Sequence, residues 1–312
     1  MATDTIFELH PGHPFSSEIK RILLEQADRA IWQLTTPGLD VDTAVHDVRK
    51  CFKRLRGVLR LVRDDIGEKR FAELNALFRD AGRELSDIRT SAVLSETLEK
   101  VHERFPQQLS EAEVQRLTAR LRAHHEALRD QIVPRETLFS QVAAELQHGR
   151  KLIKRLPLQG NHFPSPGLRR VYARGRRGLA RCQKDPAVAH FHEWRKRVKY
   201  LRFHIRILSP AWPPVLGGVT AELVVLSELL GLDHDLAELH RTLTEHPELR
   251  LRGAEQGKTV RLIGFYRQEL EARSFSMGVR LYAEKPGDFV NRMHIYWRAW
   301  QDDQGGDFPV SE

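Results

Sequence analysis

Apolar residues recur every three or four positions along most of the chain, which is the spacing of an amphipathic α-helix. The pattern predicts helices over the stretches 16–34, 45–63, 114–132, 135–156, 168–184, 191–208, 219–230, 236–243 and 259–275. No run alternates apolar and polar residues as a half-buried strand does. The sequence therefore predicts an all-α protein.

Two of these stretches, 45–63 and 191–208, carry positive charge on the side opposite to their apolar residues. The first cationic face comprises His46, Arg49, Lys50, Lys53, Arg56, Arg60 and Arg63. The second comprises His192, Arg195, Lys196, Lys199, Arg202 and Arg206. Equivalent positions lie 146 residues apart, as His46 and His192 do. The chain thus contains an internal repeat of a basic helix.

A solvated helix face usually mixes charges of both signs, but these two faces do not. The first stretch has seven Lys or Arg residues against one acid, Asp47, and the second has six against Glu193. Such a row of fixed positive charges repels itself unless anions lie nearby. For a single basic helix a solvated surface is the better interpretation, but the repetition favours an anion-binding site.

The repeated pattern H-x-x-R-K-x-x-K-x-x-R resembles the CHAD family, the conserved histidine α-helical domain. Members of that family carry a Gly-x-x-Arg-Asp element after each copy. After the second copy this chain keeps Gly231 and Asp235 but has His234 in place of the arginine. After the first copy it has Ser86 in place of the glycine and Thr90 in place of the aspartate.

The resemblance runs from about Pro14 to Trp300 and implies two four-helix bundles, an internal duplication, related by a pseudo-twofold axis around a basic central groove. The Pro- and Gly-rich segment 157–167 is expected to link the halves 14–156 and 168–300, and 301–312 is expected to form an acidic tail. Known members of the family bind long-chain inorganic polyphosphate in that groove. The resemblance therefore implies a polyphosphate-binding protein that is not an enzyme and uses no cofactor or metal.

The motif positions are the principal expected phosphate contacts: Arg49, Lys50, Lys53, Arg56, Arg195, Lys196, Lys199 and Arg202. Charge and helix face alone add Arg60, Arg206, Arg170, Arg174 and Arg177. The last three share a face with Arg181 in 168–184, a stretch with seven Lys or Arg residues and no acid. Arginine offers forked contacts to phosphoryl oxygens and lysine a mobile point charge, a mixture that suits a flexible polymer.

His46 and His192 stand at the head of the two basic rows. Their imidazoles could donate hydrogen bonds to phosphate when protonated, although neighbouring cations oppose that charge. Capping or packing is an equally good interpretation. If they protonate on binding, affinity should rise as the pH falls from 8 to 6.

Composition points to polyanionic partners without choosing among them. The net charge of +8 and the pI of about 9.6 suit nucleic acid, an anionic membrane surface or condensed phosphate. The two cysteines, Cys51 and Cys182, fit buried thiols in a reducing compartment. No secretory signal is evident, and no stretch approaches the length of a membrane span. We expect a cytoplasmic protein with polyphosphate granules or polyphosphate-metabolising enzymes as candidate partners and no membrane.

Two other functions stay open. The basic faces could hold nucleic acid, although they carry few aromatic residues for stacking and no known DNA- or RNA-binding motif. An enzyme that hydrolyses or transfers phosphoryl groups would need acids near the groove, and the suitable candidates are Asp87, Asp233 and Asp235.

Several local expectations concern the connections. The stretch 253–259 approaches a phosphate-binding loop but has three residues between its glycines where the motif needs four, so we expect an ordinary loop before a helix. The Pro-rich segment 209–218 should be a loop, and Gly231 should form a turn between two helices. Ser110 and Glu113 have the spacing of a capping box.

Overall fold

The computed structural model describes residues 7–85, 90–129, 135–246 and 254–305. All regular secondary structure in those ranges is helical, which confirms the predicted all-α class. The α-helices are α1 (Phe15–Thr35), α2 (Val41–Leu61), α3 (Arg63–Ile66), α4 (Glu68–Glu84), α5 (Thr90–Arg104), α6 (Glu111–Arg129), α7 (Arg135–Lys154), α8 (Ser165–Lys184), α9 (Val188–Leu208), α10 (Pro213–Glu245), α11 (Ala254–Leu281) and α12 (Pro286–Gly305).

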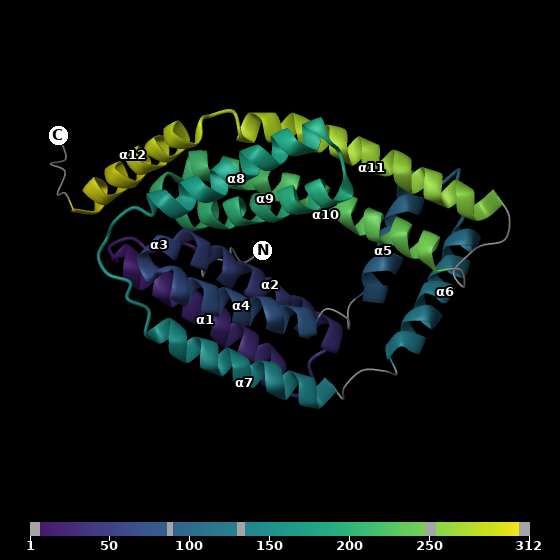
Figure 1. The fold of residues 1–312 in the computed structure, drawn as a ribbon, viewed down its shortest axis with the longest axis horizontal. Coiled ribbons are helices and arrows are strands. Elements are labelled where there is room, and N and C mark those ends of the chain that lie inside the picture. The colour runs from purple at the N-terminus through teal and green to yellow at the C-terminus, as the bar shows by residue number, and fades with distance from the viewer. Residues whose placement is uncertain (1–6, 86–89, 130–134, 247–253, 306–312) are drawn as a thin grey trace, which may run out of the picture.

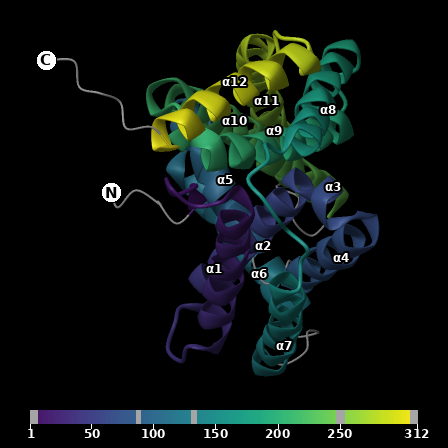
Figure 2. The ribbon, with the colours of Figure 1, turned by 90° about the vertical axis from the view of Figure 1, so that its left-hand side faces the viewer.

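The helices form two groups that meet along α2 and α9. In the first group α1 and α4 each pack against α2 and α7. In the second group α9 packs against α8 and α10, α10 packs against α11, and α12 covers α8. Figure 2 shows the first group on one side of the molecule and the second on the other. Because α2 and α9 contact each other across this boundary, the two basic helices lie at the centre of the molecule.

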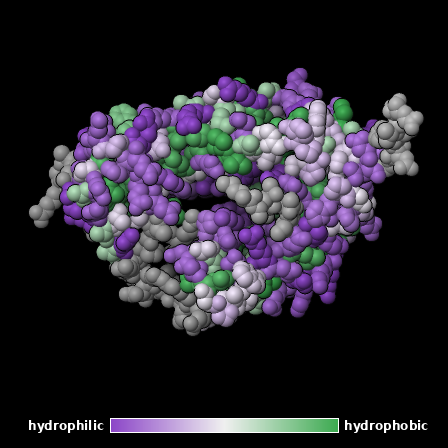
Figure 3. Space-filling model, turned by 180° about the vertical axis from the view of Figure 1, so that it is seen from behind, coloured by the Kyte–Doolittle hydropathy of each residue, from purple (hydrophilic) through white to green (hydrophobic). Residues whose placement is uncertain are grey.

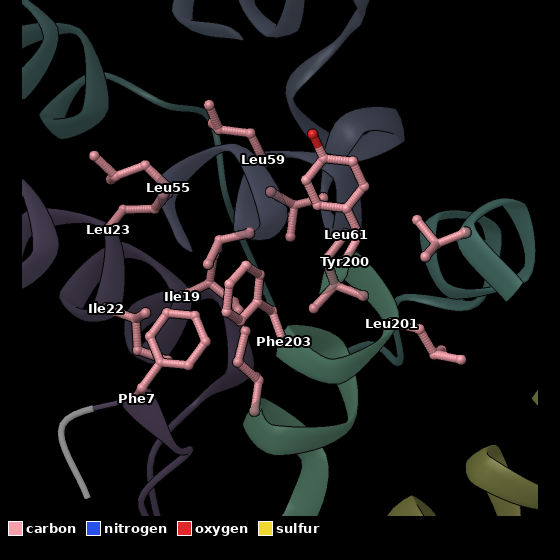
Figure 4. Packing of buried hydrophobic residues seen from close by; sticks show 14 of the residues in the cluster. Phe7, Ile19, Ile22, Leu23, Leu55, Leu59, Leu61, Tyr200, Leu201 and Phe203 are labelled. Carbon is pink, nitrogen blue, oxygen red and sulfur yellow. The ribbon is translucent and has the colours of Figure 1, made fainter. Parts of the chain in front are cut away.

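One hydrophobic core runs through both groups. Ile19 of α1, Leu55 of α2 and Phe203 of α9 belong to the same buried cluster (Figure 4). The predicted apolar faces of α2 and α9 point into this core, which leaves their basic residues outside it. Cys51 and Cys182 are buried thiols, as expected, and burial raises the pKa of Cys182 to about 12.

The hairpin of α5 and α6 packs against the second group although its sequence belongs to the first half. α5 contacts α6, α10 and α11. Leu98 and Leu117 of the hairpin share a buried cluster with Leu236 and Ile263. Figure 1 shows the hairpin beside one end of α10 and α11. The division into 14–156 and 168–300 and the pseudo-twofold axis remain predictions.

Helix α10 corrects two sequence expectations. It runs from Pro213 to Glu245 without a break, so the turn expected at Gly231 is wrong, and the loop expected over 209–218 is wrong from Pro213 onward. Proline has no backbone N–H, but a helix makes no internal hydrogen bonds with the N–H groups of its first turn. The prolines at the start of α10 therefore do not disrupt it. Gly231 is buried inside the helix, and a Cβ added to it would lie 3.8 Å from Nη2 of Arg195. Packing against α9 therefore stabilises helix at a residue that local preference assigns to a turn.

Within the described ranges, α10 is also the one helix whose length and hydropathy match a membrane span. The expectation that no stretch would approach that length was wrong. Leu223, Leu230 and Leu236 of α10 are nonetheless buried against its neighbours α5, α9 and α11. Packing within the protein accounts for these leucines, whereas Val225 of the same helix is 40% exposed.

The capping box contacts the first turns of α11 through Lys258. Ser110 N donates a hydrogen bond to Oε2 of Glu113 (2.7 Å), and Glu113 N donates one to Oγ of Ser110 (3.4 Å), which confirms the predicted cap. The hydrogen bond from the Ser110 backbone is the main reason that the pKa of Glu113 is lowered to about 2. α11 begins at Ala254, so residues 254–259 are helical where a loop was expected, and Lys258 pairs with Glu113 at 3.1 Å.

Candidate anion-binding site

Helices α2 and α9 cross in close contact at Gly57. A Cβ added to Gly57 would lie 2.7 Å from Cδ2 of Phe203, so only glycine lets the helices approach this closely. Nε2 of His204, which is fully buried, donates a hydrogen bond to the Gly57 carbonyl oxygen (2.9 Å). Burial lowers the pKa of His204 to about 4, so a neutral imidazole holds the crossing.

The crossing gathers bases from three helices into what we call the central cluster: Lys53 of α2, His192, Arg195 and Lys199 of α9, and His234 of α10. Burial, together with the charges of Arg195 and Lys53, lowers the pKa of Lys199 to about 6. Burial and Arg195 lower the pKa of His234 to about 3. Burial also lowers the pKa of His192, whose Nδ1 lies 3.3 Å from Nδ1 of His234.

The acids beside the central cluster offset only part of the cost of burying Arg195. Asp235 and Asp233 favour the charged form of Arg195, but burial still lowers its pKa. Asp233 also accepts a 2.8 Å hydrogen bond from Nε of Arg267. Nε of Arg195 is buried without a hydrogen-bond partner among the described residues. Because a buried cation costs free energy, an anion in contact with Arg195 would offset that cost.

Other members of the two basic rows contact acids, in pairs formed by Lys50 with Asp47 (3.1 Å), Lys196 with Glu193, and Arg206 with Glu8 (2.6 Å). The Lys50 and Lys196 side chains are 53% and 39% exposed. Exposed pairs are worth about 1 kcal/mol or less, so both lysines can exchange their acid for phosphate. His46 is half-buried near the start of α2.

The remaining motif arginines are held by neighbouring groups. Nη1 of Arg49 donates to the carbonyl oxygen of Gly82 (2.6 Å), and Nε of Arg56 donates to Oδ1 of Asn75 (3.2 Å). Both acceptors belong to α4, which orients this row of α2. The Arg202 guanidinium lies 5.1 Å from the ring centroid of its neighbour in the chain, and burial lowers its pKa.

A second group of arginines surrounds a small pocket where α2, α3, α4, α8 and α9 meet. We call it the arginine pocket, and it is lined by Arg60, Arg63, Phe71, Asn75, Arg170, Val171, Arg174 and Arg197. Of the additional candidates from the sequence, Arg60, Arg170 and Arg174 lie in this pocket. Arg177 lies in a separate groove between α8 and α12.

The space-filling view in Figure 3 shows a hollow between the two groups of helices, with hydrophilic residues along its lower edge. The segment 86–89, which holds Ser86 and Asp87, lies outside the described residues, as does the side chain of Thr90. The supporting element after the first basic helix is therefore not described. Its counterpart after the second helix places His234 and Asp235 on α10 beside Arg195.

The family model described as the CHAD domain matches residues 23–244, well over half of the chain. The chain belongs to the CHAD domain family. Among solved structures, PptA from Streptomyces chartreusis is similar with a TM-score of 0.56 and 13% sequence identity, covering 87% of this chain and 100% of that one. The CHAD domain from the plant Ricinus communis is 21% identical, with 94% of each chain covered and a TM-score of 0.46. A search of curated proteins found no match.

Three basic residues of this CHAD domain were not among the expected phosphate contacts. Arg54 adds its charge to that of Arg202, and Arg63 and Arg197 line the arginine pocket. Arg63 belonged to the predicted cationic face. Arg54 and Arg197 are next to motif positions in the sequence, but the rotation of about 100° per residue places them off the cationic face. Only the packing of α9 and α8 against α2 reveals that they lie close to other arginines.

Proposed function

We propose that this CHAD domain binds long-chain inorganic polyphosphate and catalyses no reaction on it. The observation that carries the proposal is the central cluster, in which Lys53 from one half of the chain meets Arg195 and Lys199 from the other. Burial lowers the pKa of Arg195 and of Lys199, so it disfavours their charged forms, and a bound anion would offset that cost. The family resemblance suggests polyphosphate as the ligand, because known CHAD proteins bind it.

The chemistry of the ligand suits this arrangement. Polyphosphate is a linear polymer with about one charge per unit, and it releases counterions when cations replace them. One row of basic residues extends along α2, which rises about 1.5 Å per residue. It comprises Arg49, Lys53, Arg56 and Arg60, and it offers an extended series of contacts instead of a single binding point. Arg195 leaves its buried Nε available for an acceptor.

The proposal extends to location and partners. A protein that holds polyphosphate without chemistry would work in the cytoplasm, on polyphosphate granules or beside enzymes that make or degrade the polymer. Electrostatic attraction between its basic surface and the polymer would bring the protein to such sites.

Nucleic acid is the alternative ligand for the same basic rows. Single-stranded nucleic acid is usually held by aromatic side chains that stack on its bases. The exposed large aromatic residues in the described ranges are Trp32, Trp212 and Phe265, and none belongs to α2 or α9. The basic rows therefore favour a ligand that is read through its phosphates alone.

A phosphohydrolase or phosphotransferase is the other alternative. Among its candidate acids, Asp233 is buried and bonded to Arg267, and Asp87 lies outside the described residues. The described ranges contain no group of three or more His, Cys, Asp or Glu side chains placed to hold a metal ion. Release of orthophosphate by the purified protein, lost in Asp235→Asn, would favour an enzyme over our proposal.

Calorimetry at two salt concentrations tests the proposed function. We expect tight binding of long-chain polyphosphate that weakens about tenfold or more between 50 and 200 mM salt. Changing Lys53, Arg56, Lys199 and Arg202 together to Ala should weaken binding by about a hundredfold, since each charged hydrogen bond is worth roughly 1.5–3 kcal/mol and the losses overlap. Circular dichroism should show that the variant remains helical.

A matched control removes the same number of lysines and arginines elsewhere. Lys151, Lys154, Arg155 and Arg298 are exposed and lie outside both basic rows, so their combined change to Ala should alter affinity by less than about threefold. Equal losses in the two variants would mean that net charge, and not this site, governs binding. A wild-type protein that ignores polyphosphate but holds labelled RNA would exclude the proposed function and leave the family assignment intact.

A further inference from the structure

We propose that the arginine pocket binds a single dianionic phosphate group, and that in the polyphosphate-bound protein this group is the terminal phosphoryl group of the chain. The first part concerns the pocket alone. The second part deepens the proposed function and rests on it.

The arginine pocket is separate from the central cluster. Arg60 follows Lys53 by seven residues on α2, which places the two about 10 Å apart along the helix axis. Five different helices contribute lining residues. The pocket volume is about 110 Å³. This is far below the roughly 300–1,000 Å³ of sites for drug-sized molecules, but it is several times the space that one water needs. A small ion fits these dimensions.

The charges of the pocket favour the binding of an anion. No carboxylate is among the lining residues in the described part of the chain. Three of its arginines pair with acids, in the pairs Arg63 with Glu68 (2.6 Å), Arg170 with Asp64 (2.7 Å) and Arg197 with Glu193 (3.1 Å). Arg60 and Arg174 form no salt bridge with an acid of the described ranges. Five guanidinium groups face three carboxylates, one of which, Glu193, also pairs with Lys196, so the excess is at least two positive charges.

Several donors of the pocket are already held in place. Nη1 of Arg60 donates to the carbonyl oxygen of Arg56 (2.6 Å), and its guanidinium lies 4.2 Å from the ring centroid of Tyr200 and 5.6 Å from that of Phe71. Nη2 of Arg170 is held by its acid, while Nη1 is buried and has no partner among the described residues. Fixed donors lower the entropy cost of binding, and an oxyanion would supply the missing acceptor.

The electrostatics agree with the geometry. Burial lowers the pKa of Arg60 to about 10, and it acts together with the charges of Arg56, Arg197 and Arg174. Burial and the charges of Arg197 and its other neighbours also lower the pKa of Arg174. Each arginine therefore destabilises the charge of the next, and a bound anion would relieve this repulsion.

The charge of the ligand distinguishes a chain end from the chain interior. An internal unit of polyphosphate carries about one negative charge, whereas a terminal phosphoryl group with a second pKa near 6 carries roughly −1.5 to −2 at neutral pH. An excess of at least two positive charges suits the doubly charged terminal group better than a singly charged internal unit. A small pocket also accepts a group with one covalent connection more readily than a unit that continues in both directions.

The test compares ligands and variants by calorimetry. Orthophosphate serves as one probe, and short polyphosphates with free ends or with both ends capped as alkyl esters serve as the others. In the wild type, chains with free ends should bind about tenfold more tightly than capped chains. Arg174→Gln should abolish that difference and weaken orthophosphate binding about tenfold. Arg174 is exposed, so the variant should fold normally. Arg298→Gln, an exposed arginine on α12, serves as the control and should behave as the wild type.

The outcomes separate the two parts of the proposal. If Arg174→Gln binds orthophosphate as the wild type does, the phosphate site is wrong. If Arg174→Gln weakens orthophosphate binding but capping has no effect on the wild type, the pocket binds free phosphate and its assignment to the chain end is wrong. If the wild type binds orthophosphate but no polyphosphate of any kind, the proposed function fails while the phosphate site stands.

Discussion

At the scale of single residues, Lys199 is the most informative side chain. Its burial beside Arg195 and Lys53 lowers its pKa to about 6, so it is largely neutral at neutral pH when no ligand is bound. From the sequence, protonation of His46 and His192 on binding was one of two equal interpretations. Burial lowers the pKa of His192, and it lowers that of the adjacent His234 to about 3, so burial disfavours a charged imidazole at both positions. A bound polyanion would favour the protonated lysine.

This gives a prediction for the pH dependence of binding. The pKa of Lys199 is about 6 in the free protein, and a bound polyanion raises it. At a pH between the free and the bound pKa, the complex therefore holds one more proton on Lys199 than the free protein does. Polyphosphate affinity should therefore rise as the pH falls from 8 to 6, and calorimetry in two buffers of different ionisation enthalpy should detect proton uptake. Lys199→Met should bind more weakly and lose most of the pH dependence.

Lys199→Arg is the matched variant, because arginine keeps its charge over the whole range. It should bind polyphosphate with little change between pH 6 and 8. A pH dependence that persists in both variants would assign the titration to another group and would contradict the role given to Lys199.

At the scale of helices, two close approaches set the geometry of the site. The first is the crossing of α2 and α9 at Gly57, which places Lys53 near Lys199. The second is the start of α8, where a Cβ added to Gly167 would lie 1.9 Å from the carbonyl oxygen of Leu61 at the end of α2. This contact brings the arginines of α8 to the arginine pocket.

Alanine substitutions at these contacts should destabilise the fold. Gly57→Ala would meet a buried aromatic ring and should lower the free energy of unfolding by about 1–3 kcal/mol, the usual cost of overpacking. Gly167→Ala would meet backbone, which cannot move aside, and should cost more. Urea denaturation followed by circular dichroism measures both effects.

Gly218→Ala is the control for these two variants. It lies in α10 with no atom within 4 Å of the added Cβ, so the helical preference of alanine should leave stability unchanged or raise it by up to about 1 kcal/mol. Equal losses in all three variants would mean that the close contacts do not control the packing of these helices.

At the scale of the whole molecule, the site joins the two groups of helices. The central cluster draws on α2 from the first group and on α9 and α10 from the second. The arginine pocket likewise combines α2, α3 and α4 with α8 and α9. A ligand that binds both groups adds interactions between them that are lost on unfolding.

Polyphosphate should therefore raise the thermal stability of the entire protein. At a free concentration one hundred times the Kd, mass action contributes about 2.7 kcal/mol, which corresponds to a rise of several degrees in Tm for a chain of this size. Scanning calorimetry at fixed salt measures the shift. The variant with Lys53, Arg56, Lys199 and Arg202 changed to Ala should show little shift, and a shift as large as that of the wild type would place the ligand elsewhere.

The sequence alone was sufficient for the helical class, the repeated basic helices, the family resemblance and the cap at Ser110. Each of these depends on residues that are close in the chain or on a motif that occurs twice, so periodicity and spacing reveal them. The same local reasoning misassigned α10, because Gly231 favours a turn by local preference but lies inside a continuous helix that packs against α9.

Only the tertiary structure decided which charges meet. The pKa of Lys199 depends on burial and on Lys53, which lies 146 residues earlier, and the arginine pocket combines side chains from five helices. Electrostatic energies depend on distance in space and on exclusion of water, and neither can be read from helical periodicity. The sequence thus identified the basic residues, and packing determined which of them form a cluster or a pocket and which, such as Arg206 beside Glu8, pair with an acid.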